Sequence, residues 1–211
     1  AIALTLALTR GVARLDRALR AGQSELGAVG HLHRHTSRTF GVLGLGAIGA
    51  ATARKARGLG FTVIGADPQR EVGTVTDEGV AVVSMEELQS RADVLSLHIP
   101  LNAATAHLVD AAFISAMKAG AVLINTCRGG VIDTLALVDA LTSGQLSGAG
   151  LDVFEVEPLP SNHALLALEN VVLTPHAAWY SEESFSELKR RTAEHAASVA
   201  LGGPGVHVVN L

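Results

Sequence analysis

The sequence has a single cysteine, few aromatic residues and no excess of basic charge. Cys127 has no second cysteine to pair with, which excludes an intrachain disulfide and favours a reducing compartment such as the cytoplasm. Lys and Arg number 16 against 20 Asp and Glu, with the two signs interspersed, so no basic surface for nucleic acid is expected. No apolar run approaches the length of a membrane span. Nucleic acid and membrane are therefore not expected partners.

Glycine and small apolar residues are abundant instead. Hydrophobic residues make up 48% of the chain although aromatics make up only 3%, and there are 22 glycines. This composition suits an α/β protein, in which helices pack closely on a sheet and tight turns join them.

Short apolar runs alternate with helical stretches from residue 40 onward. The runs expected to be strands are 40–43, 61–64, 94–98, 121–125, 149–153 and 171–173. Strands that alternate with helices form a parallel sheet with right-handed crossovers. The predicted fold is therefore α/β, a doubly wound parallel sheet of the Rossmann type.

The first helix is predicted from its apolar spacing. Apolar residues recur every three or four positions between Leu8 and Leu19, which predicts one helix over 2–20 that ends at Gly22. A polar connector is expected to follow it, and residues 23–39 have that composition.

Three later helices are predicted from their capping residues. Ser84 with Glu87 forms a capping box, and Asp133 can cap a helix over 134–142. Ser181 is expected to start a last helix, with acidic residues in its first turn, that reaches about Leu201.

A glycine motif directly follows the first predicted strand. Gly44, Gly46 and Gly49 form G-x-G-x-x-G and open a helix, which is the context in which this motif binds a dinucleotide. The first glycine permits a tight turn, the second lets the backbone approach a pyrophosphate, and the third lets the helix pack close to the strand. The amides of Ala47 and Ile48 would face the phosphates. A glycine-rich turn in another α/β protein is the alternative.

An acidic residue follows the second predicted strand. Asp67 can accept hydrogen bonds from an adenosine ribose and would repel a 2′-phosphate. The loop and this carboxylate together predict NAD rather than NADP as cofactor.

Three polar motifs lie where later strands are expected to end. They contain Arg128, Glu157 and His176, and ligands bind at the carboxyl ends of strands in open parallel sheets. An arginine can grip a carboxylate with two parallel hydrogen bonds, a histidine can donate a proton, and a glutamate can orient that histidine. Taken singly, each could be a surface ion pair, a loop carboxylate or a packed histidine. Glu155 is expected to be a solvated carboxylate without a role.

These motifs together resemble the D-2-hydroxyacid dehydrogenase family over nearly the whole chain. The stretches are N-T-C-R-G, D-V-F-E-V-E-P and T-P-H. The resemblance implies that Arg128, Glu157 and His176 are catalytic. It also implies that Asp152 and Thr126 lie on the nicotinamide side of the cofactor. The residues expected to contact the cofactor are Gly44, Gly46, Ala47, Ile48, Gly49, Asp67, His98, Pro100, Asn102, Thr126, Cys127, Arg128, Asp152 and His176.

The string P-H-A-A-W-Y-S-E-E is similar to the C-terminal binding protein branch of the family. The resemblance makes Trp179, together with Arg128, a candidate substrate contact. Formate dehydrogenases carry Gln at the position of Glu157, which argues against them. Phosphoglycerate dehydrogenases share the three catalytic residues but usually lack H-A-A-W. Cys127 stands where the family more often has Ala or Ser, and we interpret it as a small packing residue.

The resemblance also implies a function and a domain plan. The expected reaction is reduction of a 2-keto acid to the D-2-hydroxy acid by an NAD-dependent oxidoreductase; an NAD(H)-sensing scaffold of the same fold is the alternative. Residues 1–180 are expected to form the NAD-binding domain, with 1–22 as its leading interdomain helix, and 181–211 a helix and tail that return to a flavodoxin-like substrate domain. That domain is expected to be largely absent from this chain. A homodimer through the NAD-binding domain is expected.

No metal site is expected. His31, His33 and His35 alternate in H-x-H-x-H, a pattern that can bind metal. They precede the first strand, and no carboxylate or cysteine lies close by in the sequence. A solvated linker is the favoured interpretation.

Overall fold

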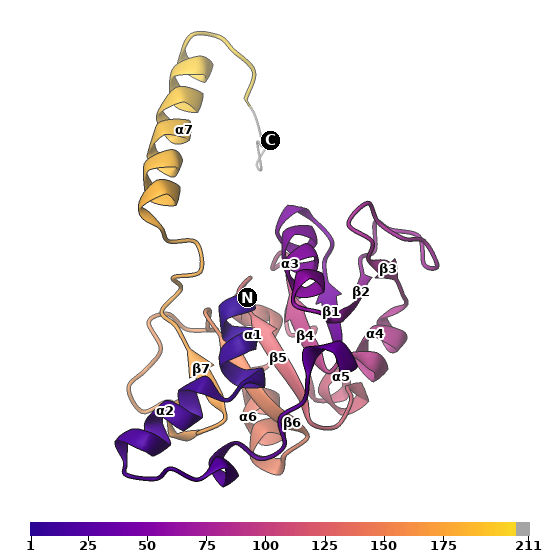
Figure 1. Ribbon diagram of the computed structural model, residues 1–211. Coiled ribbons are helices and arrows are strands. Elements are labelled where there is room, and N and C mark those ends of the chain that lie inside the picture. The colour runs from indigo at the N-terminus through magenta and orange to yellow at the C-terminus, as the bar shows by residue number, and fades with distance from the viewer. Residues whose placement is uncertain (206–211) are drawn as a thin grey trace. The chain divides into compact units, whose positions relative to one another are not determined.

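The computed structural model describes residues 1–205 and divides the chain into two compact units, Ala1–His176 and a second that begins at Ala177 (Figure 1). The strands are β1 Thr39–Leu43, β2 Thr62–Ala66, β3 Ala81–Val82, β4 Val94–Leu97, β5 Ala121–Asn125, β6 Leu146–Leu151 and β7 Val171–Leu173. The helices are α1 Ile2–Thr9, α2 Val12–Arg20, α3 Ala47–Gly58, α4 Met85–Arg91, α5 Ala111–Ala116, α6 Thr134–Ser143 and α7 Glu182–Ala200. Short 3-10 turns occupy Leu26–Val29, His35–Ser37, Gly129–Val131 and Ala164–Ala167.

The first unit is built on one parallel sheet with the strand order β3-β2-β1-β4-β5-β6-β7. The strand order reverses between β1 and β4, which in open parallel sheets is the point where ligands bind at the carboxyl ends of the strands. The predicted doubly wound parallel sheet is confirmed. The two-residue strand β3 and the six-residue helix α5 were not predicted, because segments this short carry too few residues for a periodic pattern.

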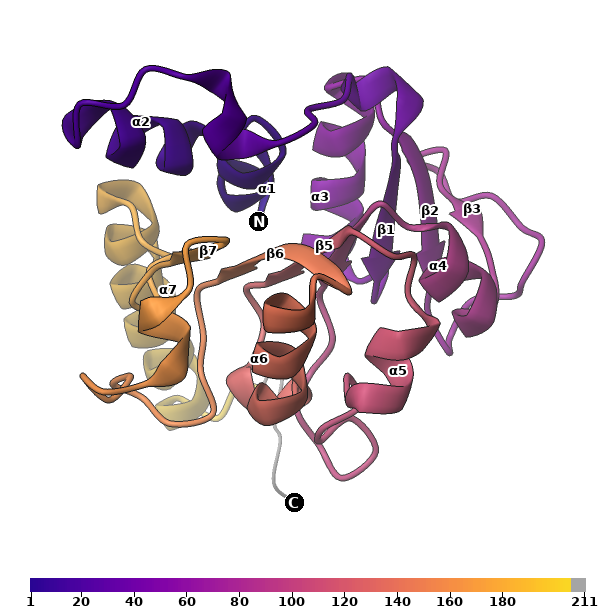
Figure 2. The same cartoon turned by 90° about the horizontal axis from the view of Figure 1, so that it is seen from below.

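Helices cover both faces of this sheet. Helices α1 and α3 lie on one face, and α4, α5 and α6 lie on the other (Figure 2). Alternate residues of one strand serve the two cores: Phe40 and Val42 pack with the α3 side, whereas Leu43 packs with the α4 side. Because both faces are buried, the strands are nearly continuous apolar runs, as parallel sheets require.

The single helix predicted over 2–20 is wrong. The structure contains α1 and α2, separated by Gly11, which has φ +64° and is buried. A Cβ at Gly11 would lie 2.5 Å from a methyl group of Val29, so the chain bends where only glycine fits. The apolar positions that suggested one continuous face are divided by this bend, and Val12 and Leu19 are exposed.

The predicted helix caps are confirmed. Ser84 and Glu87 form both bonds of a capping box. Asp133 accepts hydrogen bonds from two backbone amides at the start of α6, and Ser181 accepts one from Ser184 at the start of α7.

The second unit contains α7 and the residues leading into it. Trp179, Tyr180 and Phe185 contact one another through their rings. Along α7, Arg190 pairs with Glu187 and with Glu194 at spacings of three and four residues, which supports an exposed helix. Residues 206–211 of the segment predicted over 181–211 lie outside the described residues. Nowhere in residues 1–205 is there a helix long and apolar enough to cross a membrane.

Candidate active site

The glycine loop lies at the carboxyl end of β1, beside the end of β4. Gly44 has φ +92°, and a Cβ there would lie 2.5 Å from the carbonyl oxygen of His98. Its amide donates to Ala66 at the end of β2. The loop therefore touches the ends of both strands that flank β1, which is the position of a nucleotide site in this kind of sheet.

The other two glycines of the loop have different surroundings. A Cβ at Gly49 would collide with the carbonyl oxygen of Gly44, so this glycine permits α3 to pack against the loop. A Cβ at Gly46, the N-cap of α3, would meet nothing within 4 Å. The loop backbone is thus open on the side of Gly46, where a pyrophosphate could approach the first amides of α3, those of Ala47 and Ile48. These features fit a dinucleotide.

Asp67 is tied to the glycine loop. Its Oδ2 accepts a hydrogen bond from the Leu45 amide at 2.7 Å, and its Oδ1 accepts one from the Gln69 amide at 2.8 Å. These two bonds fix the carboxylate at the end of β2 beside the loop. Each carboxylate oxygen has a further lone pair for a ribose hydroxyl.

The segment after β4 carries His98, Pro100 and Asn102. The side chain of His98 is largely buried, its Nε2 lies 2.9 Å from Ser96 Oγ, and burial lowers its pKa to about 4. This histidine is therefore neutral at physiological pH. Pro100 and Asn102 are exposed, and the carbonyl of Pro100 accepts a hydrogen bond from Thr105 at 2.7 Å.

The segment after β5 forms a tight turn around a buried side chain. Asn125 donates to the carbonyl of Arg128 at 2.9 Å and accepts from the Cys127 amide at 3.0 Å. Burial raises the pKa of the Cys127 thiol, which agrees with a packing residue. Thr126 stands between these residues, half-buried. The guanidinium of Arg128 is exposed and donates to the carbonyl of Cys127 at 2.6 Å.

The structure brings His176 and Glu157 together. His176 Nδ1 lies 2.7 Å from Glu157 Oε2, and Glu157 Oε1 accepts a hydrogen bond from the Phe154 amide at 3.0 Å. The Phe154 amide, and then the bond to His176, hold the pKa of Glu157 below its usual value. An ionised carboxylate therefore orients the imidazole through Nδ1. This pair borders an apolar cavity lined by Pro158, Leu173 and their neighbours.

Asp152 and Thr174 are hydrogen-bonded to each other, and Asp152 also bonds the backbone of His176. Asp152 is 1% exposed and accepts a hydrogen bond from Thr174 Oγ1 at 2.5 Å. Its carbonyl oxygen accepts from the His176 amide at 2.7 Å. The sequence motif T-P-H marked the histidine but gave no sign that its threonine bonds to an aspartate 22 residues earlier.

Glu155 is exposed, as predicted, but its carboxylate also has partners. Its Oε1 accepts a hydrogen bond from the Thr134 amide at 2.7 Å, and its Oε2 lies 3.1 Å from His107 Nε2. Burial would raise the pKa of Glu155, but the bonds from Thr134 and His107 outweigh it and the pKa is lowered. The sequence could not reveal these partners because both are distant along the chain.

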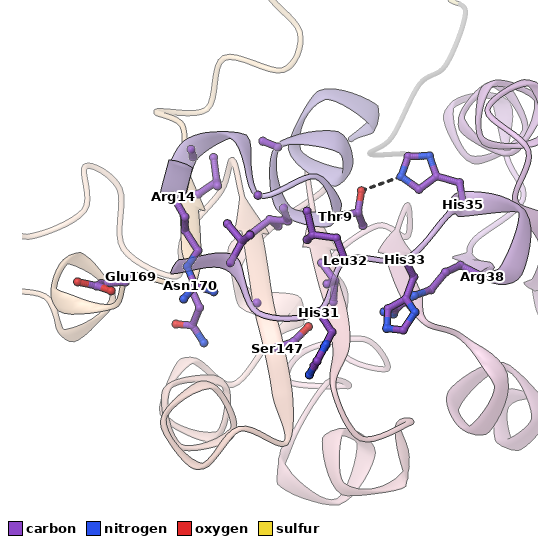
Figure 3. Close-up of a pocket in the computed structure, with 18 residues that line it drawn as sticks. Thr9, Arg14, His31, Leu32, His33, His35, Arg38, Ser147, Glu169 and Asn170 are labelled. Atoms are coloured by element: carbon purple, nitrogen blue, oxygen red, sulfur yellow. Dashed lines mark hydrogen bonds between the residues drawn. The ribbon is translucent and has the colours of Figure 1, made fainter. Parts of the chain in front are cut away.

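The histidine run lies at the other end of the sheet, in a cavity lined by α1, the connector and the starts of β6 and β7 (Figure 3). His31 and His33 are exposed, as a linker predicts. His35 is not solvated: it stacks on Phe61 with ring centroids 4.4 Å apart, and its Nε2 lies 3.1 Å from Thr9 Oγ1. Among residues 1–205, no three His, Cys, Asp or Glu side chains are grouped so that they could hold a metal.

Trp179 belongs to the second unit, where its ring contacts Tyr180 and Phe185. Its expected role as a substrate contact stays a prediction.

Known proteins resemble the chain in sequence and in structure. The family described as "D-isomer specific 2-hydroxyacid dehydrogenase, NAD binding domain" matches residues 2–178. A glyoxylate reductase from Korarchaeum cryptofilum is 40% identical over 213 residues, which cover 100% of this chain and 64% of that protein.

Two solved structures extend the comparison. A D-lactate dehydrogenase from Treponema pallidum matches with a TM-score of 0.89 and 33% identity, covering 100% of this chain and 67% of that one. A D-lactate dehydrogenase from Aquifex aeolicus, complexed with NAD and lactic acid, matches with a TM-score of 0.86 and 30% identity, covering 95% and 65%. The chain thus spans about two thirds of the length of these relatives.

Proposed function

Because the chain belongs to the D-isomer specific 2-hydroxyacid dehydrogenase family and matches its NAD-binding domain, we propose that the protein reduces a 2-keto acid to the D-2-hydroxy acid. The observation that carries this proposal is the 2.7 Å contact between His176 and Glu157 at the carboxyl edge of the sheet. A histidine held by an ionised carboxylate is suited to exchange a proton with a substrate oxygen.

The cofactor would be held by the loop from Gly44 to Gly49 and by Asp67. The open backbone at Gly46 fits a pyrophosphate, and the fixed carboxylate of Asp67 fits a ribose. The family resemblance adds His98, Pro100 and Asn102 on the adenosine side. On the nicotinamide side it adds Thr126, Cys127, Arg128, Asp152 and His176. NADH supplies the hydride when it is bound.

The protein side chains would bind the substrate carboxylate and supply the proton for the carbonyl oxygen. Arg128 carries an exposed guanidinium, which can bind a substrate carboxylate with two parallel hydrogen bonds and polarise the neighbouring carbonyl. Glu157 occupies Nδ1 of His176, so Nε2 is the ring atom that gives its proton to the carbonyl oxygen. The alcohol oxygen thereby receives one proton as the keto carbon receives one hydride, and the imidazole is left neutral.

The substrate class follows from the relatives. One that is 40% identical is named a glyoxylate reductase, and two structural neighbours are D-lactate dehydrogenases. We therefore propose a short 2-keto acid as the substrate, with Trp179 as a further contact. The scaffold alternative is not favoured, since these relatives are named as enzymes. Assignment to the C-terminal binding protein branch, the domain boundary at 180, a homodimer and a cytoplasmic location stay predictions.

The proposal is tested by NADH oxidation in the full-length protein with glyoxylate, pyruvate, hydroxypyruvate and 3-phosphohydroxypyruvate. Turnover of at least one of them is expected, and chiral chromatography of a product that has a stereocentre should show the D isomer. Tight NADH binding without turnover of any 2-keto acid would contradict the proposal and would support an NAD(H)-sensing protein.

A further inference from the structure

We propose that Glu155 is a positioning residue, which braces the loop that carries Glu157 and so keeps the Glu157 carboxylate aligned on His176. This inference rests on the proposed function, because it assigns a role within the same site. Only the second carboxylate of the motif D-V-F-E-V-E-P, Glu157, was expected to have a role. The structure gives the first, Glu155, three links to surrounding segments.

The first two links are made by the side chain. Glu155 Oε1 accepts from the backbone amide of Thr134, the first residue of α6, at 2.7 Å. Glu155 Oε2 contacts His107 Nε2 at 3.1 Å. The carboxylate therefore joins the loop after β6 to a helix 21 residues earlier and to a loop 48 residues earlier. Two bonds from one carboxylate to separate segments hold its backbone in place from both sides.

The third link is made by the backbone. A Cβ at Gly129 would overlap the carbonyl group of Phe154 and the amide of Glu155, so the turn after Arg128 lies directly against this loop. His107 is fastened to the same turn, because its amide donates to the carbonyl of Gly130 at 2.9 Å. His107 also has φ +50°, an uncommon conformation for a residue other than glycine that surrounding contacts must maintain.

The consequence for Glu157 follows from its nearest donor. The Phe154 amide donates to Glu157 Oε1 at 3.0 Å, and Phe154 immediately precedes the braced residue. That bond is the largest cause of the lowered pKa of Glu157. If Glu155 no longer holds the loop, the Phe154 amide loses its fixed direction and the Glu157 carboxylate loses the donor that keeps it ionised and aligned.

The test uses the direction in which the pKa of Glu157 changes to separate the effect of alignment from the effect of charge. Glu155→Ala removes both the bonds that align the loop and the negative charge of Glu155. Loss of a nearby negative charge alone would lower the pKa of Glu157, whereas loss of alignment would raise it toward 4.5. Glu155→Gln keeps an oxygen to accept from Thr134 and an NH₂ group that can bond His107, so alignment is kept while the charge is lost, and this variant should not raise the pKa of Glu157. Glu169→Ala, which removes an exposed carboxylate without a bond to this loop, is the matched control.

The readouts are carboxyl ¹³C NMR titration of Glu157 and hydrogen exchange of the Phe154 amide, both in the full-length protein. The proposal expects Glu155→Ala to raise the Glu157 pKa and to speed Phe154 exchange roughly tenfold or more. Glu155→Gln should neither raise that pKa nor speed the exchange, and Glu169→Ala should leave both unchanged. A lowered or unchanged Glu157 pKa in Glu155→Ala overturns the proposal. If that variant does not fold, Glu155→Asp, which keeps the charge but is too short to span both partners, should give the same two changes, and wild-type values in it overturn the proposal.

Neither readout requires turnover, so the brace and the proposed reaction can fail separately. If the keto acids are turned over, the kcat of Glu155→Ala should fall roughly tenfold or more at unchanged affinity for NADH, and Glu155→Gln should recover most of it. If no keto acid is turned over while the NMR shifts appear, the proposed function fails and the brace stands.

Discussion

His176 Nδ1 lies 2.7 Å from Glu157 Oε2, and the two residues reach each other from the loops after neighbouring strands, β6 and β7. His176 has φ +52°, a left-handed conformation that costs a non-glycine residue of order 1 kcal/mol or more. The bond from its amide to the Asp152 carbonyl helps to hold it there. The histidine is thus fixed at both its backbone and its ring, which is the preorganisation a proton donor needs.

Removing the imidazole should stop the chemistry and leave cofactor binding in place. We expect His176→Ala to lower kcat for keto-acid reduction roughly 10²–10⁴-fold, the usual contribution of a general acid. The Kd for NADH, measured by fluorescence titration, should change less than about threefold, because the glycine loop and Asp67 are untouched. Glu157→Gln keeps the shape of the side chain but removes the negative charge beside Nδ1 of His176. Its kcat should lie between those of wild type and His176→Ala. Weaker NADH binding with retained turnover in His176→Ala would refute the assignment.

Two glycines of one loop should respond differently to alanine. A Cβ at Gly49 collides with the Gly44 carbonyl, so Gly49→Ala should lower the unfolding free energy by about 1–3 kcal/mol, as overpacking does. A Cβ at Gly46 meets nothing within 4 Å, and its φ of −68° suits alanine. Gly46→Ala should therefore cost less than about 1 kcal/mol yet weaken NADH binding roughly tenfold or more, because the methyl group occupies the side open to the pyrophosphate.

Denaturant unfolding and NADH titration of the two variants check this pair. Gly58→Ala, in α3 and also without a neighbour within 4 Å, is the control: it should leave NADH affinity unchanged and raise the unfolding free energy by up to about 1 kcal/mol, as alanine does at a helical position with room for it. Unchanged NADH affinity in Gly46→Ala would remove the loop from the cofactor site.

The elements that the sequence predicted correctly have local signals. The strand–glycine loop–helix unit is contiguous, and the caps at Ser84, Asp133 and Ser181 act within three residues. Parallel topology then brings the ends of separate strands to one edge, so residues at those ends could be expected to gather there.

The features that the sequence did not predict depend on contacts between distant segments. Gly11, where the chain bends, lies against Val29, which leaves no room for a side chain there, and His35 is packed against Phe61. Glu155 contacts His107, which is 48 residues away along the chain, at 3.1 Å. A periodic pattern records which face of a segment is apolar; it does not record which distant side chain that face meets.

Replacing Asp67 should change the choice of nucleotide. Asp67→Asn removes the charge that would repel a 2′-phosphate, and we expect the preference for NADH over NADPH, as a ratio of Kd values, to fall roughly tenfold, which corresponds to about 1.4 kcal/mol. The amide retains one acceptor for the two donors now bonded, those of Leu45 and Gln69. A stability loss of about 1–2 kcal/mol should accompany the change. Glu71→Gln, an exposed carboxylate nearby in the chain, should leave the ratio unchanged; an unchanged ratio in Asp67→Asn would exclude Asp67 as the discriminating residue.

Removal of the hydrogen bond between Thr174 and Asp152 should lower the stability of the fold. Thr174→Val keeps the shape of the side chain and deletes the donor to a carboxylate that is 1% exposed. Loss of a hydrogen bond to a buried charged group should lower the unfolding free energy by about 1.5–3 kcal/mol. Thr174→Ser retains the hydroxyl and should recover most of it. A valine variant as stable as wild type in urea unfolding would show that the hydroxyl does not stabilise the fold at this position.

His98 should make stability depend on pH in a defined window. Burial lowers its pKa in the folded state from 6.5 to about 4, so the unfolded chain binds this proton more tightly between these values. Stability should therefore rise as pH increases from 4 to 6.5, with the full contribution present above 6.5 and lost below 4. A pKa difference of about 2.5 units corresponds to about 3 kcal/mol.

Urea unfolding at pH 4.5 and pH 7.5 measures this dependence of stability on pH. Carboxylates and His35 also titrate over the range, but they are common to wild type and His98→Gln, so the difference between the two slopes isolates His98. The wild type should lose more stability than His98→Gln on acidification; parallel slopes would mean that His98 is not kept neutral by the fold.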